Sequence, residues 1–227
     1  MYSTKTTLLL DMNSTFMFGE DRFSVDGDYS LIYQEMGGSL SRQVVNKIIR
    51  SAYSYLDERY PDLNYRHDFP SLAKAITCVT EYELTEQELE NIIATFAYHE
   101  IGNIPDEYID ALYELHKKFQ LAVVIDIWAP KKYWLDLFEK LEISGLFSAS
   151  SFSSDHGMVK PSPKPFELVI DRLGITKNEA LVVGDSVRRD LGGARSAGID
   201  CVLVGGSKDL NALESYENLL EFCKAVC

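Results

Sequence analysis

Residues 180–190 read ALVVGDSVRRD, and this stretch shows the pattern on which the predicted fold depends. A short run of apolar residues is typical of a strand that is buried on both faces of a sheet. Asp185 follows the run closely, and Asp190 comes about one helical turn later. A carboxylate after a buried strand is costly to desolvate unless it is paired or binds a metal. The stretch therefore predicts a strand whose carboxyl end carries functional acids.

Other charged residues follow the same pattern elsewhere in the chain. Asp11 comes directly after the run TTLLL, Asp126 follows LAVVI, and Lys160 stands in a loop before a predicted helix. A single Asp after a strand is often only a helix N-cap. Four aspartates in this order favour a shared site, because the carboxyl ends of parallel strands meet at one edge of a sheet. They are Asp11, Asp126, Asp185 and Asp190. Asp11 and Asp185 would offer the hard oxygen ligands that Mg²⁺ prefers.

Apolar strands alternate with amphipathic helices along the second half of the chain, and this alternation predicts an α/β fold with a doubly wound parallel sheet. A first strand at residues 6–10 is separated from this region by mostly helical sequence over residues 30–100. A structureless loop of that length would be unusual, so an inserted helical module is expected. The predicted elements are helix 106–119, strand 121–125, helix 131–141, strand 146–152, helix 163–173, strand 180–183, helix 188–197 and strand 201–204.

Composition narrows the classes of function. The 227 residues are 46% hydrophobic and 25% charged, as in an ordinary globular protein, and the formal net charge is -13. That charge argues against nonspecific binding to nucleic acid or to an anionic membrane. The N-terminus lacks the features of a signal peptide, and no apolar run is long enough to span a membrane. The four cysteines are interpreted as reduced thiols, so we expect a cytoplasmic protein.

Three segments together resemble the motifs of the haloacid dehalogenase-like (HAD) superfamily. Residues 11–15 (DMNST) resemble its first motif, residues 159–163 (VKPSP) its third, and residues 183–190 (VGDSVRRD) its fourth. The resemblance implies a Rossmann-like core formed by residues 1–23 and 101–227. Residues 24–100 would then form a helical cap domain that closes over the substrate.

The resemblance also implies a role for each matching residue. Asp11 would be the nucleophile, which attacks phosphorus and forms an aspartyl-phosphate. Mg²⁺ would be held by Asp11, Asp185 and the main-chain carbonyl of Asn13, while Asp190 would order a metal-bound water or Lys160. Lys160 would offset negative charge on the nucleophile and on the transferring group.

Two positions depart from the family pattern. The family phosphatases carry Asp two residues after the nucleophile as the general acid and base, whereas this chain has Asn13. An amide cannot deliver a proton, and that catalysis is worth about 10²–10⁴-fold. The family also places a Ser or Thr, usually followed by Asn, at the phosphate-binding end of the second strand. Ile125 and Asp126 align with those positions, so the hydroxyl is missing and a carboxylate could repel phosphate.

Three functions remain open from the sequence. The first is Mg²⁺-dependent hydrolysis of a small phosphorylated molecule, with a weakened acid–base step. The second is hydrolysis of a carbon–halogen bond, because HAD dehalogenases lack the second acid and need no metal. The third is a domain that has lost turnover and acts in binding. Trp128, close to Asp126, either lines the site or covers the sheet edge. The protein is expected to be a monomer or a homodimer.

Overall fold

The computed structural model describes residues 2–227, which contain a six-stranded sheet whose pairings are all parallel. The strand order is β3-β2-β1-β4-β5-β6, so β1 lies inside the sheet and the order reverses beside it. This is the order of a doubly wound fold, and it confirms the predicted fold class. The strands are β1 (Thr7–Leu10), β2 (Gln120–Ile125), β3 (Phe147–Phe152), β4 (Ala180–Gly184), β5 (Asp200–Leu203) and β6 (Glu214–Ser215).

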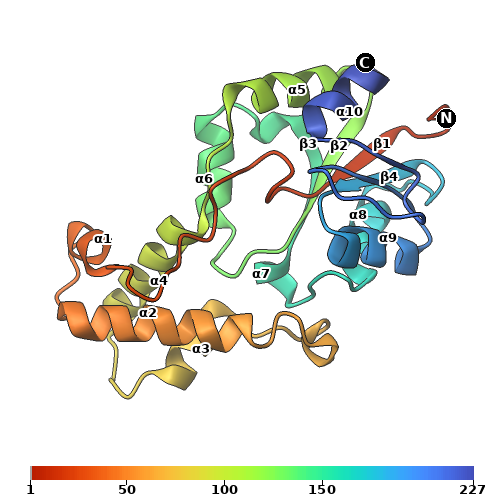
Figure 1. Cartoon of the computed structure of the whole chain (residues 1–227). Helices are drawn as coiled ribbons and strands as arrows, with labels where there is room; N and C mark the ends of the chain where they lie inside the picture. The colour runs from red at the N-terminus through yellow and green to blue at the C-terminus, as the bar shows by residue number, and fades with distance from the viewer. Residues whose placement is uncertain (1) are drawn as a thin grey trace.

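Helices cover both faces of the sheet (Figure 1). Successive side chains of a strand point to opposite faces, so Leu9 packs with Phe166 and Ala194 on one face, while Leu8 and Leu10 belong to the core on the other. Helices α8 and α9 cover the first face, and α5, α6 and α10 cover the second. The core helices are α5 (Asp106–His116), α6 (Lys132–Lys140), α7 (Ser153–His156), α8 (Lys164–Leu173), α9 (Gly192–Ala197) and α10 (Leu219–Val226).

The segment between β1 and α5 is helical, as expected, and its helices lie to one side of the sheet (Figure 1). Its last helix begins with a capping box. The Thr85 hydroxyl accepts from the Glu88 N–H at 3.2 Å, and the Glu88 carboxylate accepts from the Thr85 N–H at 2.8 Å. The domain boundaries at 23/24 and 100/101 stay a prediction. The helices are α1 (Ser30–Glu35), α2 (Arg42–Asp57), α3 (Leu72–Val79) and α4 (Glu86–Glu100), with a 3₁₀ turn at Leu63–Tyr65.

The single helix predicted over residues 188–197 is in fact two elements. A π-helical turn spans Val187–Leu191, and α9 follows it. The N–H groups of Asp190 and Leu191 both donate to the carbonyl of Ser186, at 2.9 and 3.1 Å. The second of these bonds encloses one more residue than an α-helical bond, which widens the turn. Apolar periodicity does not distinguish such a turn from an α-helix, because the same side chains are buried.

Among residues 2–227, no helix combines the length and apolar character needed to cross a lipid bilayer.

Candidate active site

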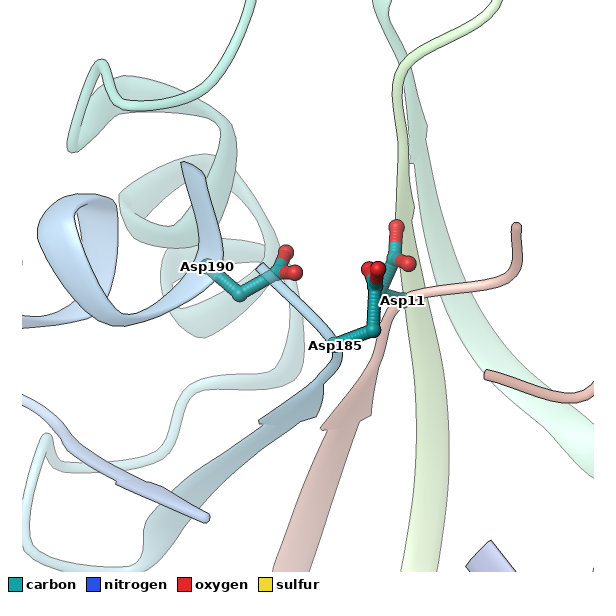
Figure 2. A group of neighbouring side chains, drawn as sticks. All are labelled: Asp11, Asp185 and Asp190. Carbon is teal, nitrogen blue, oxygen red and sulfur yellow. The ribbon is translucent and has the colours of Figure 1, made fainter. Parts of the chain in front are cut away.

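Three carboxylates converge at the carboxyl ends of the two central strands (Figure 2). Asp11 follows β1, and its N–H donates to the Val183 carbonyl of β4 at 2.9 Å. Asp185 follows β4 directly, and Asp190 reaches the same place from the π-helical turn. One oxygen from each of the three lies within 4.8 Å of the other two. The topology thus brings together residues that are far apart in the sequence.

Lys160 links two of these carboxylates. Its ammonium lies 2.5 Å from Asp11 Oδ1 and 2.7 Å from Asp190 Oδ1. The side chain comes from the loop before α8 and is only 2% exposed. Burial by itself would lower the pKa of Lys160, but the carboxylates of Asp11 and Asp190 raise it overall, so the lysine stays charged. The buried ammonium of Lys160 therefore forms ion pairs with two buried carboxylates.

Asp11 is held by its neighbours through both side-chain oxygens. Lys160 donates to Oδ1, and the Thr15 hydroxyl donates to Oδ2 at 3.2 Å. Burial raises the pKa of Asp11 to about 7; Lys160 opposes that rise, and Asp190 adds to it. A nearby cation would favour the charged form that a nucleophile needs.

The donor set fits a hard divalent cation. Both oxygens of Asp190 have partners, because Oδ1 accepts from Lys160 and Oδ2 accepts from the Ser186 N–H at 2.9 Å. Asp190 is thus suited to hold Lys160 in place. Asp11 is likewise partnered through both oxygens, but a carboxylate oxygen accepts more than one bond, so each of the three acids can still offer a ligand oxygen. Burial, with help from Asp190, raises the pKa of Asp185. A cation among these acids would relieve their repulsion, and carboxylate oxygens are what Mg²⁺ prefers.

A cavity of about 210 Å³ opens beside Asp11. Three more of the predicted site residues line it, namely Asn13, Asp126 and Lys160, and Trp128 lines it too. Trp128 thus lies where the first alternative requires it, and a role for it in function stays a prediction. The remaining lining residues are Ser14, Glu20, Asp21, Tyr60, Glu100 and Arg189.

Ile125 and Asp126, which depart from the family pattern at the end of β2, lie in different environments. Asp126 Oδ2 accepts from the Tyr60 hydroxyl at 2.8 Å and from the main-chain N–H of Lys160 at 3.0 Å. The carboxylate that was expected to repel phosphate is thus paired. The Ile125 side chain is 1% exposed, packs in the core and is not among the residues that line the cavity. A contact of Ile125 with substrate stays a prediction.

Asn13 brings an unsatisfied polar atom to the cavity. Its Oδ1 is buried and has no hydrogen-bond partner within residues 2–227. The next residue, Ser14, adopts a left-handed backbone conformation with φ 57°. A buried acceptor without a donor costs about 1–3 kcal/mol, so a donor from a bound molecule would stabilise this position.

Tyr60, Glu100 and Arg189 line the cavity but were not identified from the sequence. Tyr60 and Glu100 come from the helical insert, and the Glu100 carboxylate accepts from the N–H groups of Trp128 and Ala129 at 2.6 and 2.8 Å. No local pattern marks either residue, because their contacts depend on how the insert packs against the core. Arg189 did carry a signal, since it stands next to Asp190 in the stretch that determines the fold.

Comparison with known proteins agrees with this geometry. The model of the haloacid dehalogenase-like hydrolase family matches residues 6–198. A phospholysine phosphohistidine inorganic pyrophosphate phosphatase of Xenopus laevis is 27% identical over 135 residues, which cover 56% of this chain and 48% of that protein. The chain thus matches about half the length of this curated relative.

Solved structures share the fold at low sequence identity. A HAD phosphatase from Thermococcus onnurineus matches with a TM-score of 0.62 and 23% identity, over 98% of this chain and 97% of that one. A 2-haloacid dehalogenase from Pseudomonas syringae pv. Tomato DC3000 matches with a TM-score of 0.65 and 19% identity, over 98% of each chain. Because both kinds of enzyme share this fold, the fold alone does not choose between their reactions.

Proposed function

Because the chain belongs to the haloacid dehalogenase-like hydrolase family, we propose that it hydrolyses phosphate monoesters of small molecules through a covalent aspartyl-phosphate at Asp11. The observation that carries this proposal is the convergence of Asp11, Asp185 and Asp190 within 4.8 Å. Hydrolysis of a carbon–halogen bond in this family needs no metal, so it gives no reason for such a cluster. Phosphoryl transfer gives a reason for the three carboxylates, because they can hold a divalent cation that stabilises the charge on the transferring group.

The chemistry at Asp11 proceeds in two steps. First, a carboxylate oxygen of Asp11 attacks phosphorus and the bond from phosphorus to the leaving oxygen breaks. Water then attacks the phosphorus of the aspartyl-phosphate, which releases inorganic phosphate and restores the carboxylate. Lys160 holds Asp11 and offsets charge in both steps. Mg²⁺, held by Asp11, Asp185 and the main chain of Asn13, would supply electrostatic stabilisation of the phosphoryl oxygens.

Asn13 determines which substrates are favourable. The leaving oxygen departs with the electron pair of the broken bond and needs a proton unless it is already a weak base. Asn13 has no proton to transfer, so acyl and aryl phosphates are expected to react faster than alkyl phosphates.

The four free cysteines fit a reducing compartment, and we place the protein in the cytoplasm.

The test is a substrate panel with Mg²⁺ and with EDTA. Aryl, acyl and alkyl phosphates and 2-haloacids would be supplied to the wild type, to Asp11→Asn and to Asp171→Asn, which changes an exposed acid on α8. We expect Mg²⁺-dependent phosphate release by the wild type and Asp171→Asn, and none above background by Asp11→Asn. Intact-mass spectrometry of the wild type should detect one added phosphoryl group.

Other outcomes would contradict the proposal. Halide release in EDTA would favour the dehalogenase reaction. Turnover by Asp11→Asn near that of the wild type would exclude the covalent step. No reaction with any member of the panel would favour a binding domain.

A further inference from the structure

Arg189 occupies an unusual place in the site. It lies within the π-helical turn Val187–Leu191, is half-buried, and lines the cavity that also contains Asp11. Single π-helical turns are rare and often occur at functional sites. The same turn also supplies Asp190, which holds Lys160 at 2.7 Å. Arg189 is thus carried by an element that is already part of the catalytic arrangement.

In the described part of the chain, the guanidinium of Arg189 is not paired with an acid. Within residues 2–227 it makes no ion pair shorter than 4.0 Å and donates no side-chain hydrogen bond, although acidic residues line much of the same cavity. By contrast, the ammonium of Lys160 is already shared between Asp11 and Asp190. Within residues 2–227, Arg189 is therefore the cation lining this cavity whose side-chain donors are all unused, whereas Lys160 already donates to two carboxylates.

An aromatic ring orients Arg189 instead of a carboxylate. The centre of the guanidinium lies 5.3 Å from the centroid of the Tyr60 ring, and the Tyr60 hydroxyl is anchored on Asp126. The guanidinium of an arginine stays charged in proteins, so Arg189 brings a positive charge to the cavity. Stacking on a ring limits the motion of the guanidinium and leaves its N–H groups available.

We propose that Arg189 binds non-bridging oxygens of the phosphoryl group and takes the place of the hydroxyl that is missing at Ile125. This inference rests on the proposed function, because it concerns the same site. A phosphoryl group that enters a cavity lined by Asp11, Glu20 and Asp126 needs a positive charge that is not already neutralised. The planar guanidinium matches two phosphate oxygens at once, which a hydroxyl cannot do.

A different anionic group of the substrate could also meet Arg189, such as a carboxylate on the leaving group. Inorganic phosphate separates the two sources, because it has the oxygens of the transferred group and nothing else. Binding of phosphate in the presence of Mg²⁺ would be measured by isothermal titration calorimetry for the wild type, Arg189→Gln, Arg189→Lys and Arg195→Gln. Arg195 is an exposed arginine on α9 and serves as the matched control.

Arg189→Gln should weaken phosphate binding about 10- to 100-fold, which is the effect of losing a hydrogen bond to a charged group. Arg189→Lys should bind with intermediate affinity, because it keeps the charge without the two-pronged geometry. Arg195→Gln should match the wild type. Circular dichroism and melting temperatures would be measured for every variant, so that loss of fold is distinguished from loss of binding.

Two results would overturn the inference. One is a wild type that does not bind phosphate; the other is Arg189→Gln with wild-type affinity for phosphate, even if it processes carboxylate-bearing phosphate esters more slowly. If the wild type binds phosphate, Arg189→Gln does not, and no phosphate ester is hydrolysed, the contact at Arg189 stands and the proposed function fails.

Discussion

Asn13 is the residue whose replacement tests the acid–base deficit most directly. Its Oδ1 is buried and has no donor among residues 2–227, and Asp11 and Glu20 line the same cavity. A carboxyl group introduced there would be desolvated beside other acids, and both effects raise its pKa. A carboxyl that is still protonated near neutral pH is suited to protonate a leaving oxygen.

Asn13→Asp should therefore raise phosphatase activity by up to about 10²–10⁴-fold, the usual contribution of a general acid and base. The gain in kcat should be largest for alkyl phosphates and smaller for aryl or acyl phosphates, whose leaving groups depart unassisted. Steady-state kinetics on matched alkyl and aryl esters would measure it. Because the missing hydroxyl at Ile125 could weaken phosphate binding and so mask the gain, the double variant Asn13→Asp with Ile125→Ser would be measured too. No gain in either variant would contradict the impaired-phosphatase interpretation.

Much of the central site could be predicted residue by residue. Asp11, Asp185 and Lys160 carry local signals, because each stands at the end of an apolar run or in a recognisable motif. Tyr60 could not be found in this way. It belongs to the helical insert, and only the packing of the insert against the sheet places its hydroxyl on Asp126.

At the scale of elements, Glu100 joins helix α4 to the loop between β2 and α6. It is the last residue of α4 and is 4% exposed. Its carboxylate accepts from the main-chain N–H groups of Trp128 and Ala129. Burial raises the pKa of Glu100 to about 8; the Trp128 N–H opposes that rise, and Asp21 adds to it. This one side chain thus connects the insert with the loop that forms one wall of the cavity.

Glu100→Ala should lower the free energy of unfolding by about 1–3 kcal/mol, because a part-buried N–H group (Trp128) and a buried one (Ala129) lose their acceptor. In the wild type, the pKa of Glu100 is higher in the folded state than in the unfolded state. Its contribution to stability is thus present below pH 4.5, its ordinary pKa, and is lost as the pH rises through about 8. Urea unfolding at several pH values would measure both effects.

Glu100→Gln separates the effect of charge from that of shape. This variant should lose stability between pH 5 and pH 9 less steeply than the wild type, because its amide does not titrate in that range. Glu107→Gln, which changes an exposed acid on α5, should keep the wild-type slope. If Glu100→Gln and the wild type gave the same slope, the buried carboxyl would not be the titrating group.

Element types were easier to predict than element boundaries. The alternation of apolar strands with amphipathic helices gave the parallel sheet, because both faces of such a sheet must be covered. The π-helical turn at Val187–Leu191 was missed, since it buries the same residues as the α-helix that was predicted there. The two-residue strand β6 (Glu214–Ser215) is too short to leave a periodic signal.

For the whole molecule, the packing of the insert onto the core shapes the site. Residues of the insert and of one face of the sheet belong to a single hydrophobic cluster, for example Phe96 of α4 and Leu10 of β1. Tyr60 and Glu100 add polar links between the insert and the core. A ligand that binds among the strand ends should therefore change the stability of the whole chain, which can be measured without knowledge of the substrate.

Mg²⁺ should raise the melting temperature of the wild type. A ligand that binds only the folded state at about 100 times its Kd adds about 2.7 kcal/mol. For a chain of this size, that corresponds to a rise of roughly 5–10 °C. Differential scanning fluorimetry across a series of MgCl₂ concentrations would measure it, with KCl at matched ionic strength as the control for general screening of the net charge of -13.

Asp185→Ala should separate binding at the carboxylate cluster from screening. Without Mg²⁺ this variant should melt at or above the temperature of the wild type, because one of three mutually repelling acids is gone. With Mg²⁺ its melting temperature should stay the same, while that of Asp171→Ala, an exposed acid on α8, should rise as in the wild type. A merely destabilised variant would melt below the wild type without Mg²⁺, so it cannot imitate this result. An equal rise in Asp185→Ala and the wild type would place the cation elsewhere on the protein.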